Sequence, residues 1–447
     1  MKTRSNPNRR NSLGDRTPRR APHLHGRRLW CRHLACGHWQ RPLAALVVVA
    51  SLAGAAEVKM ADGQRVAALV EKLDEAGTIT LCLTSGERKE VPLREIASIS
   101  YSGRSDRLVR TGDQKLILNA GGHICGAVDE LKRGDTLEIA SQSLGRHVLP
   151  LKYLRGFTAQ AMEGRPSRLA DDLMRDDGIP PTPENAFLDH VLDRRGVPYA
   201  GVVENFNPLR LEFEHDEQLQ PVRMDTFKVA GVRLAEAAKD KLAPLDPIDV
   251  LQVGVLCRDR SYVVGQLVAV DPFQWKVRPA FDPERLIHVP ASELVQADVL
   301  GGRAVFLTNL TPIRAEEKTI IAPPQPFRRN ANSQGENLDI GGYIYGAGIG
   351  VHAASSLTYR IDGKFKTFLA DVAIDGRLEK EGSVVFVVTG DGRELFRSPL
   401  VTGHPSGGGL AVQVAVEGIK ELTLSAEPTD DLDQADVANW GAARLLR

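Results

Sequence analysis

An internal duplication constrains the fold of this chain more than any other feature of its sequence. Residues 58–158 contain two copies of one pattern, related by an offset of 58 residues without a gap. Three segments match across the copies: 66–70 with 124–128, 78–81 with 136–139, and 91–96 with 149–154. Each copy runs as a strand, a turn, two further strands and a closing stretch, which is V-P-L-R-E-I in the first copy. We therefore expect several small repeated domains rather than one large core.

Two looser copies follow, and the second of them ends in V-P-A-S-E-L at residues 289–294. Apolar and polar residues alternate with period two in all four copies, and Gly, Asp and Asn separate the runs, which predicts short strands. We expect small curled β-barrels of SH3-like or Sm-like shape, packed pairwise or in a row. The predicted boundaries are 57–102 (unit 1), 107–160 (unit 2), 161–187 (linker), 188–234 (unit 3) and 248–300 (unit 4).

The function of these units is open at the level of sequence. SH3-like barrels often bind peptides through grooves lined with aromatic residues, but the aromatic residues of this region are scattered. We expect spacer or docking modules, and leave protein partners as an alternative.

The charge of the chain is divided unevenly. Residues 1–56 hold 11 of the 57 Lys and Arg but one of the 57 acidic residues, so the remainder has a formal charge of −10. The basic stretch leads into an apolar run, 43–56, that is shorter than the roughly 20 residues of a spanning helix. This pattern predicts a signal peptide over 1–56 and an exported protein: periplasmic, at the cell surface or secreted. An uncleaved short anchor and a basic arm are the alternatives.

The composition excludes some partners. An acidic exported chain with 5% aromatic residues is a poor binder of nucleic acid, so we expect no such partner, and membrane contact only through the signal sequence. Cys82, Cys125 and Cys257 remain after the leader and lie in apolar runs, which predicts buried free thiols.

The sequence pattern changes near residue 305. From there on glycine is frequent, and apolar and polar residues alternate strongly as they do in strands. A D-G pair at Asp391-Gly392 between two strand-like runs predicts a hairpin. Several strands without a convincing helix predict a β-sandwich over 305–447.

Short motifs in this region occur in the order found in one known family. Residues 340–353, IGGYIYGAGIGVHA, resemble the G-x-x-Y-x-x-G-[IL]-G-V-H-A core of NPCBM domains, a class of carbohydrate-binding module found beside glycoside hydrolase domains. The stretches 356–359, 382–386, 390–392 and 395–398 follow as they do in that family, and W-G-A-A-R-L closes the domain at 440–445. The resemblance implies an all-β fold, with a jelly-roll-like, galactose-binding-type sandwich, and a glycan partner of galactose type.

Sugar recognition needs an aromatic ring that stacks on a pyranose and planar polar groups that meet its hydroxyls. Trp440 is the best ring in the sequence, although it fits the sandwich core equally well. Instead of contacting sugar, Arg444 and Asp375 could form a buried ion pair with each other. His352 could likewise make a structural hydrogen bond. The candidate carbohydrate-binding residues are Trp440, Asp436, Asn439, Arg444, His352, Asp375 and Asp391.

Three departures from the family weaken the expectation of sugar binding. Ala373-Ile374-Asp375-Gly376 stands where the family often has G-x-D-D. Ala442 stands where the closing motif usually has an acidic residue, and an early Trp is absent near Thr311. The acidic stretch 430–436 offers carboxylate oxygens for Ca²⁺, but it lacks the Gly of a tight calcium loop. We expect no cofactor, no metal site and no catalytic residue, and leave a structural Ca²⁺ open.

Three functions fit these observations. The first is an exported, non-catalytic protein that binds glycan through the C-terminal sandwich. The second is a structural or interaction protein whose sandwich has lost sugar binding. The third is an accessory part of a glycoside hydrolase system. Glycosidases need two carboxylates in a cleft, and repeats and linkers occupy most of residues 57–300, so we do not expect an enzyme.

Overall fold

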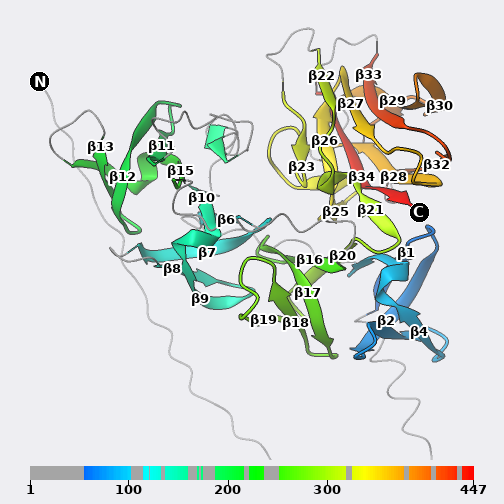
Figure 1. The fold of residues 1–447 in the computed structure, drawn as a ribbon, viewed down its shortest axis with the longest axis horizontal. Coiled ribbons are helices and arrows are strands. Elements are labelled where there is room, and N and C mark those ends of the chain that lie inside the picture. The colour runs from blue at the N-terminus through cyan, green and yellow to red at the C-terminus, as the bar shows by residue number, and fades with distance from the viewer. Residues whose placement is uncertain are drawn as a thin grey trace, which may run out of the picture. The chain divides into compact units, whose positions relative to one another are not determined.

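The computed structural model describes the larger part of the chain after the leader. The described residues are 55–101, 114–119, 121–131, 136–159, 169–170, 173–174, 187–215, 221–235, 251–318, 325–376, 382–403, 409–429 and 435–447. Their regular structure is β-strand apart from short helical turns (Figure 1), which confirms the all-β prediction. In this part of the chain no helix combines the length and apolar character needed to cross a membrane. The predicted signal peptide lies outside it except for its last two residues.

The first twenty strands form four five-stranded antiparallel units with one strand order, in which the first strand pairs with both the second and the fifth. Unit 1 contains β1 (Ala56–Met60), β2 (Arg65–Leu73), β3 (Thr78–Leu83), β4 (Arg88–Pro92) and β5 (Ile96–Ser100). Unit 2 contains β6 (Gln114–Leu118), β7 (Gly122–Leu131), β8 (Thr136–Ser141), β9 (Gly145–Pro150) and β10 (Leu154–Ala159). Unit 3 contains β11 (Asp189–Asp193), β12 (Pro198–Phe206), β13 (Arg210–His215), β14 (Val222–Asp225) and β15 (Val229–Arg233). Unit 4 contains β16 (Gln252–Cys257), β17 (Tyr262–Val270), β18 (Gln274–Pro279), β19 (Ile287–Pro290) and β20 (Leu294–Leu300).

One irregularity recurs in every unit and explains how so short a sheet curls around its core. The long second strand shifts register in its pairing with the third, between Val70 and Lys72 in unit 1 and between Leu267 and Ala269 in unit 4. Units 2 and 3 have the same shift in β7 and β12. A bulge bends a strand and increases its twist, so the second strand curls far enough to enclose a small apolar core.

The closing proline of the repeat marks the end of the fourth strand. Pro92 ends β4 and Pro150 ends β9, and each precedes a 3-10 turn (Leu93–Glu95 and Leu151–Tyr153) that leads into the fifth strand. The fourth strands are edge strands, where a residue without an N–H group breaks no ladder.

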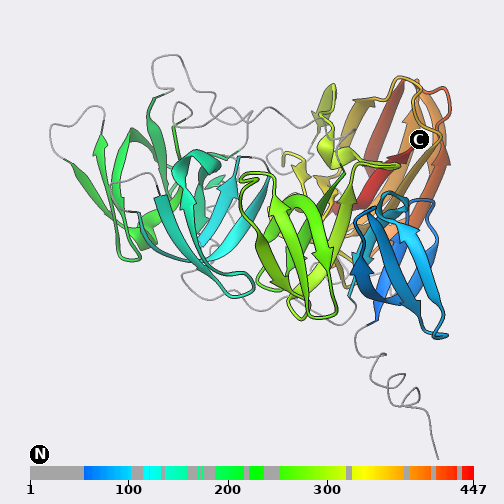
Figure 2. The same cartoon turned by 60° about the horizontal axis from the view of Figure 1, so that its bottom comes forward.

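The units pair through their fifth strands. β5 of unit 1 pairs with β20 of unit 4, with Ala297 opposite Ile99, and β10 of unit 2 pairs with β15 of unit 3, with Phe157 opposite Val232. Each fifth strand thereby gains a partner at an edge that would otherwise remain open to other chains. Figure 2 shows the curled sheets of the units in blue, cyan and green.

The remaining strands build a sandwich of two main antiparallel sheets and a small hairpin. The first sheet has the order β23-β26-β34-β28-β32, with β21 beside β34, and the second the order β22-β27-β33-β29-β30, with β31 beside β29. The first contains β21 (Ala304–Phe306), β23 (Arg328–Arg329), β26 (Gly348–His352), β28 (Thr367–Ile374), β32 (Leu410–Ala415) and β34 (Val437–Leu446). The second contains β22 (Arg314–Glu317), β27 (Ser355–Arg360), β29 (Ser383–Gly390), β30 (Arg393–Arg397), β31 (Val401–Thr402) and β33 (Glu421–Pro428). The hairpin is β24 (Leu338–Ile340) with β25 (Tyr343–Tyr345).

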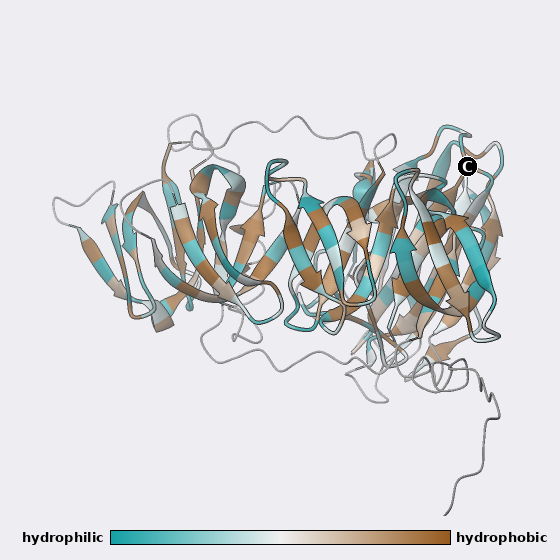
Figure 3. Cartoon of the chain, turned by 90° about the horizontal axis from the view of Figure 1, so that it is seen from below, coloured by the Kyte–Doolittle hydropathy of each residue, from teal (hydrophilic) through white to brown (hydrophobic). Residues whose placement is uncertain are grey.

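The sandwich encloses one apolar core. Apolar and polar residues alternate along many strands of the molecule (Figure 3). The central strand β34 is buried along its whole length, because both faces of its sheet are covered. Core residues lie beneath one face, whereas the β24–β25 hairpin and residues of units 1 and 4 lie against the other.

Candidate carbohydrate-binding site

Four of the seven predicted site residues come together at one end of the sandwich. β26 ends at His352, β28 ends just before Asp375, and β34 begins just after Asp436. His352 lies opposite Val437 in the β26–β34 pair, and the Asp375 N–H donates a hydrogen bond to the Val437 carbonyl at 2.8 Å. The register therefore brings together residues from three segments that are distant in sequence. Asn439 lies on β34 two residues after Val437.

Asp375 is a hydrogen-bond hub rather than a free acid. Its Oδ2 accepts from Nδ2 of Asn332 at 3.0 Å and from Nδ2 of Asn439 at 2.9 Å, and all three residues are buried. Asn439 also donates to the carbonyl of Asp339 at 3.2 Å. The sequence analysis missed Asn332, which nothing in the local pattern marks as close to Asp375. This hub holds the segment that leads into β24 against β34.

Asp436 and His352 fasten neighbouring strand ends. Oδ1 of Asp436 accepts from the Ser383 N–H at 2.7 Å, at the start of β29. Nδ1 of His352 lies 2.6 Å from the Ala353 carbonyl. Because a carbonyl only accepts, Nδ1 is the donor of this hydrogen bond. Both side chains are buried, so their first effect is to fasten the strand ends and not to face solvent.

Trp440 lies in the core of the sandwich, 1% exposed. Its ring meets Phe386 edge-on, with ring centroids 5.0 Å apart, and Phe368 at 6.3 Å. A ring at this depth offers no face on which a pyranose could stack. The expectation that Trp440 is the stacking platform therefore does not fit this position, and the core alternative does.

Asp391 lies at the opposite end of the sandwich from Asp375. It occupies the β29–β30 turn with φ 47°, and its Oδ1 accepts from the N–H groups of Lys420 and Glu421 at 3.1 and 2.9 Å. It joins that turn to the start of β33. The structure thus separates Asp391 from the other candidates and gives it a place in turn geometry.

Arg444 is also remote from Asp375, and the ion pair considered for these two residues does not form. Arg444 lies opposite Leu369, whereas Asp375 bonds to Val437, seven positions earlier on β34. At about 3.3 Å per residue, the two sites are roughly 23 Å apart. Arg444 is buried on the outer face of its sheet, and this burial lowers the pKa of its guanidinium, an effect that nearby Asp371 opposes.

Asp371 is the centre of a second polar cluster, on that outer face. Lys59 of unit 1 forms a buried ion pair with it, Arg65 contacts its other oxygen at 3.2 Å, and the Tyr345 hydroxyl donates to it at 3.0 Å. Burial lowers the pKa of Lys59, and the carboxylate of Asp371 counteracts part of that effect. This cluster joins unit 1 to the sandwich.

The exposed aromatic ring of the described sandwich is Tyr343, 46% exposed, at the start of β25. The other rings in the described part of residues 303–447 are buried or half-buried. The sequence analysis did not select Tyr343, although it lies within the glycine-rich motif.

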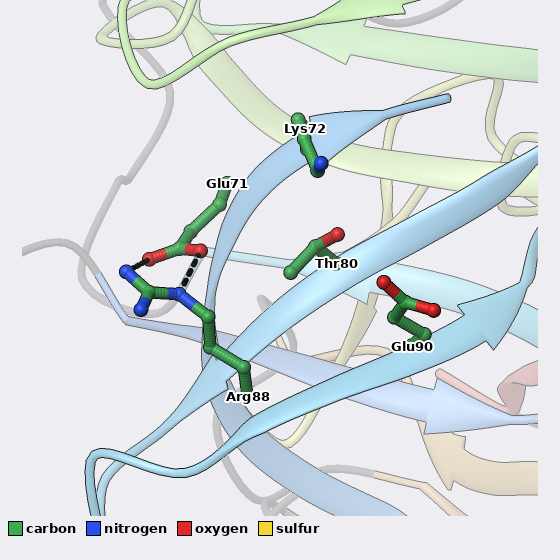
Figure 4. Close-up of a pocket in the computed structure, with 5 residues that line it drawn as sticks. All are labelled: Glu71, Lys72, Thr80, Arg88 and Glu90. Atoms are coloured by element: carbon green, nitrogen blue, oxygen red, sulfur yellow. Dashed lines mark hydrogen bonds and ion pairs between the residues drawn. The ribbon is translucent and has the colours of Figure 1, made fainter. Parts of the chain in front are cut away.

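A separate open depression of about 660 Å³ lies on unit 1 (Figure 4). Glu71 receives two hydrogen bonds from Arg88, at 2.8 and 3.1 Å, and Lys72, Thr80 and Glu90 complete the lining. Charged groups of both signs and no aromatic ring line this depression, which is typical of a solvated sheet face and not of a pyranose site. Among the described residues no group of His, Cys, Asp or Glu has an arrangement that could hold a metal ion. The sequence 430–434, considered for Ca²⁺, falls outside them.

Comparison with known proteins assigns the class of the sandwich. Residues 303–446 match the family model described as the NPCBM/NEW2 domain, which confirms the resemblance seen in the sequence. The chain thus carries a domain of the carbohydrate-binding-module class.

One curated relative is the "Putative endo-alpha-N-acetylgalactosaminidase" of Renibacterium salmoninarum, 29% identical over 194 residues. The match covers 39% of this chain but 13% of that protein, so this chain spans a small part of its length.

Two solved structures from Clostridium perfringens are also similar. The CBM51 of GH95 in complex with methyl-galactose is 25% identical and covers 32% of this chain and 99% of its own, with a TM-score of 0.29. The CBM51-2 and INT domains of ZmpB are 20% identical and cover 39% of this chain and 36% of their own, also with a TM-score of 0.29.

Proposed function

We propose that this chain is an exported, non-catalytic protein that binds glycan through its C-terminal sandwich. The observation that carries the proposal is the match of residues 303–446 to the NPCBM/NEW2 domain. Export rests on the basic and apolar leader of residues 1–56.

The end of the sandwich that holds His352, Asp375, Asp436 and Asn439 is the proposed site. Buried hydrogen bonds there fix the strand ends. A binding site needs such support, because contacts to sugar hydroxyls depend on positions held to within a fraction of an ångström. These four residues act as positioning groups for the strand ends.

The SH3-like β units serve as the scaffold of the protein and act as docking modules. Unit 4 leads into the sandwich through a tight turn, with Gly301 and Gly302 at φ 96° and 66°, and β21 follows directly. The apolar cluster of Leu256, Tyr262, Phe306, Ala347 and Ala442 packs unit 4 against the sandwich. The sandwich, held by this apolar cluster, presents its glycan site in a constant orientation relative to unit 4.

A second candidate is a structural protein that no longer binds sugar. Ala442, which replaces the usual acidic residue, lies in that apolar cluster and is 1% exposed. The family's acidic position has thus become part of a packing surface between modules, which favours an interaction role.

A glycan array probed with the purified full chain separates the two candidates. Retention of galactose-, N-acetylgalactosamine- or N-acetylglucosamine-terminated glycans supports the proposal, whereas uniform absence of retention by the folded chain favours the structural role. Fractionation of the producing cells and N-terminal sequencing of the mature protein test export. A protein that stays in the cytoplasm with its leader intact contradicts that part.

A further inference from the structure

The β24–β25 hairpin projects a single exposed aromatic ring from the outer face of the sandwich. Tyr343 begins β25, two residues before Tyr345, and is 46% exposed. Residues two apart on a strand point to the same side, and Tyr345 is only half-buried, with its hydroxyl bound to Asp371. Tyr343 therefore lies on the same side of β25 as Tyr345 and is the more exposed of the two rings.

Close packing holds the hairpin in place. Leu338 and Ile340 are fully buried against the sheet, and a Cβ atom at Gly348 would lie 2.7 Å from Cδ1 of Leu338. At Gly441 a Cβ atom would lie 2.3 Å from Cδ1 of Ile340 and 2.9 Å from Cδ1 of Tyr345. Gly348 of β26 and Gly441 of β34 thus let the hairpin pack directly on the sheet backbone, which a larger residue at either position would prevent.

The tip of the hairpin is equally well defined. Gly341 and Gly342 both have positive φ, 62° and 84°, which only glycine adopts without strain. Oδ1 of Asp339 accepts from the Gly342 N–H at 2.9 Å, and the Asp339 carbonyl accepts from Asn439. Since Asn439 also binds Asp375, the buried hub of the site and the exposed ring belong to one connected network.

A tyrosine ring held in this way suits one class of ligand. One face of a pyranose presents several C–H groups, which stack on the negative face of an aromatic ring. Tyrosine supplies this surface with only two side-chain torsions to fix, so little conformational entropy is lost on binding. We propose that Tyr343 is the platform on which the glycan's terminal pyranose stacks. This inference rests on the proposed function of the sandwich and adds the residue and the mode of contact.

A cluster of polar groups surrounds Asp371, the residue that holds Tyr345. Asp371, which binds Tyr345, also contacts Arg65, and Arg65 pairs with Glu57 at 3.2 Å. The side chains of Arg65 and Glu57 are 42% and 43% exposed.

The test compares four full-length proteins: wild type, Tyr343→Ala, Tyr343→Phe and Phe273→Ala. Phe273 is a matched control because it is an 84% exposed aromatic residue between β17 and β18 of unit 4 and not part of the sandwich. Each protein is titrated with the array glycan that the wild type retains best, and with methyl galactoside and N-acetylglucosamine. Tyr343→Ala should weaken binding about tenfold or more, while Tyr343→Phe keeps the ring and should stay within about threefold of wild type, as should Phe273→Ala. Melting temperatures establish that each variant is folded.

Each outcome has one meaning. Equal affinity of wild type and Tyr343→Ala overturns the inference and leaves the proposed function standing. Equal loss in Tyr343→Ala and Phe273→Ala shows a general surface effect and also overturns it. If the folded wild type retains no glycan, the proposed function fails, and the inference fails with it.

Discussion

Lys59 of the first β unit and Asp371 of the sandwich form a buried ion pair across 312 positions of sequence. Their side chains are 7% and 5% exposed. The carboxylate of Asp371 also accepts hydrogen bonds from Arg65 and from the hydroxyl of Tyr345. The pair buries this part of the outer sheet face of the sandwich against unit 1.

Removal of one member of this pair should destabilise the protein strongly. Lys59→Met keeps the aliphatic volume but leaves Asp371 with the partly exposed Arg65 as its cation, so we expect a loss of about 3 kcal/mol. Denaturant unfolding of the full chain measures it. Lys89→Met, on the exposed strand β4, is the control and should change little. Equal stability of the two variants would contradict the role of the pair.

Asp298 should make stability depend on pH. It is fully buried, and this burial raises the pKa of its carboxyl to about 7 despite a 2.7 Å hydrogen bond from Gln296. Tyr262, Lys59 and Arg444 are the charged or titratable groups around it. The folded protein therefore holds a proton that the unfolded chain releases near pH 4, so stability contributed by this group falls as pH rises from about 4 to 7 and is constant above.

Asp298→Asn removes this dependence, since the amide stays neutral and keeps the shape of the side chain. We expect the variant to gain on the order of a few kcal/mol above pH 7 and little below pH 4. Melting temperatures of both proteins between pH 4 and 8 give the difference directly. A difference that stays constant across this range would falsify the assignment.

Trp440 should behave as a core residue. Trp440→Ala removes a ring packed against Phe368 and Phe386, and we expect a loss of about 3–5 kcal/mol. Trp440→Phe keeps an aromatic ring and should lose less. Thermal unfolding is the measurement. A variant that melts as the wild type does but no longer binds glycan would restore the stacking interpretation.

Asp391 should matter for stability and not for glycan binding. Asp391→Ala removes the acceptor of two backbone N–H groups and places alanine at a positive φ. We expect the melting temperature to fall by about 3 °C, while Asp391→Asn, which keeps the acceptor and tolerates this backbone region, should stay near wild type. Glycan titration is the second readout. Loss of affinity in a folded Asp391→Ala protein would place the site at the other end of the sandwich.

Period-two alternation and turn residues were sufficient to predict the all-β class, because these signals act over a few residues. The order of the short motifs from 340 to 445 was sufficient for the NPCBM resemblance. The duplication of 66–70 at 124–128 corresponds to the second strands β2 and β7, which bend at equivalent places. These features are local, so they are present in the chain before it folds.

The position of each candidate side chain was decided by the tertiary structure. Between Gly441 and Arg444, β34 has two residues opposite one of β28, and Ala442 has φ 47°. This bulge changes the alternation, so that Trp440 faces the core and Arg444 the outer face. A one-residue change of register reverses the face of every following side chain, and no pattern in W-G-A-A-R-L reveals it.

The sequence by itself determined the repeated β units, the sandwich and its family, because backbone pattern and motif order are properties of neighbouring residues. Only the tertiary structure decided that Asp375 binds two amides, that Asp371 meets Lys59, and that Tyr343 is the exposed ring. Burial and pairing depend on which distant strands cover a face. Which strands cover each sheet face is decided when the units pack against one another. Packing removes apolar surface and charged groups from water at the same time.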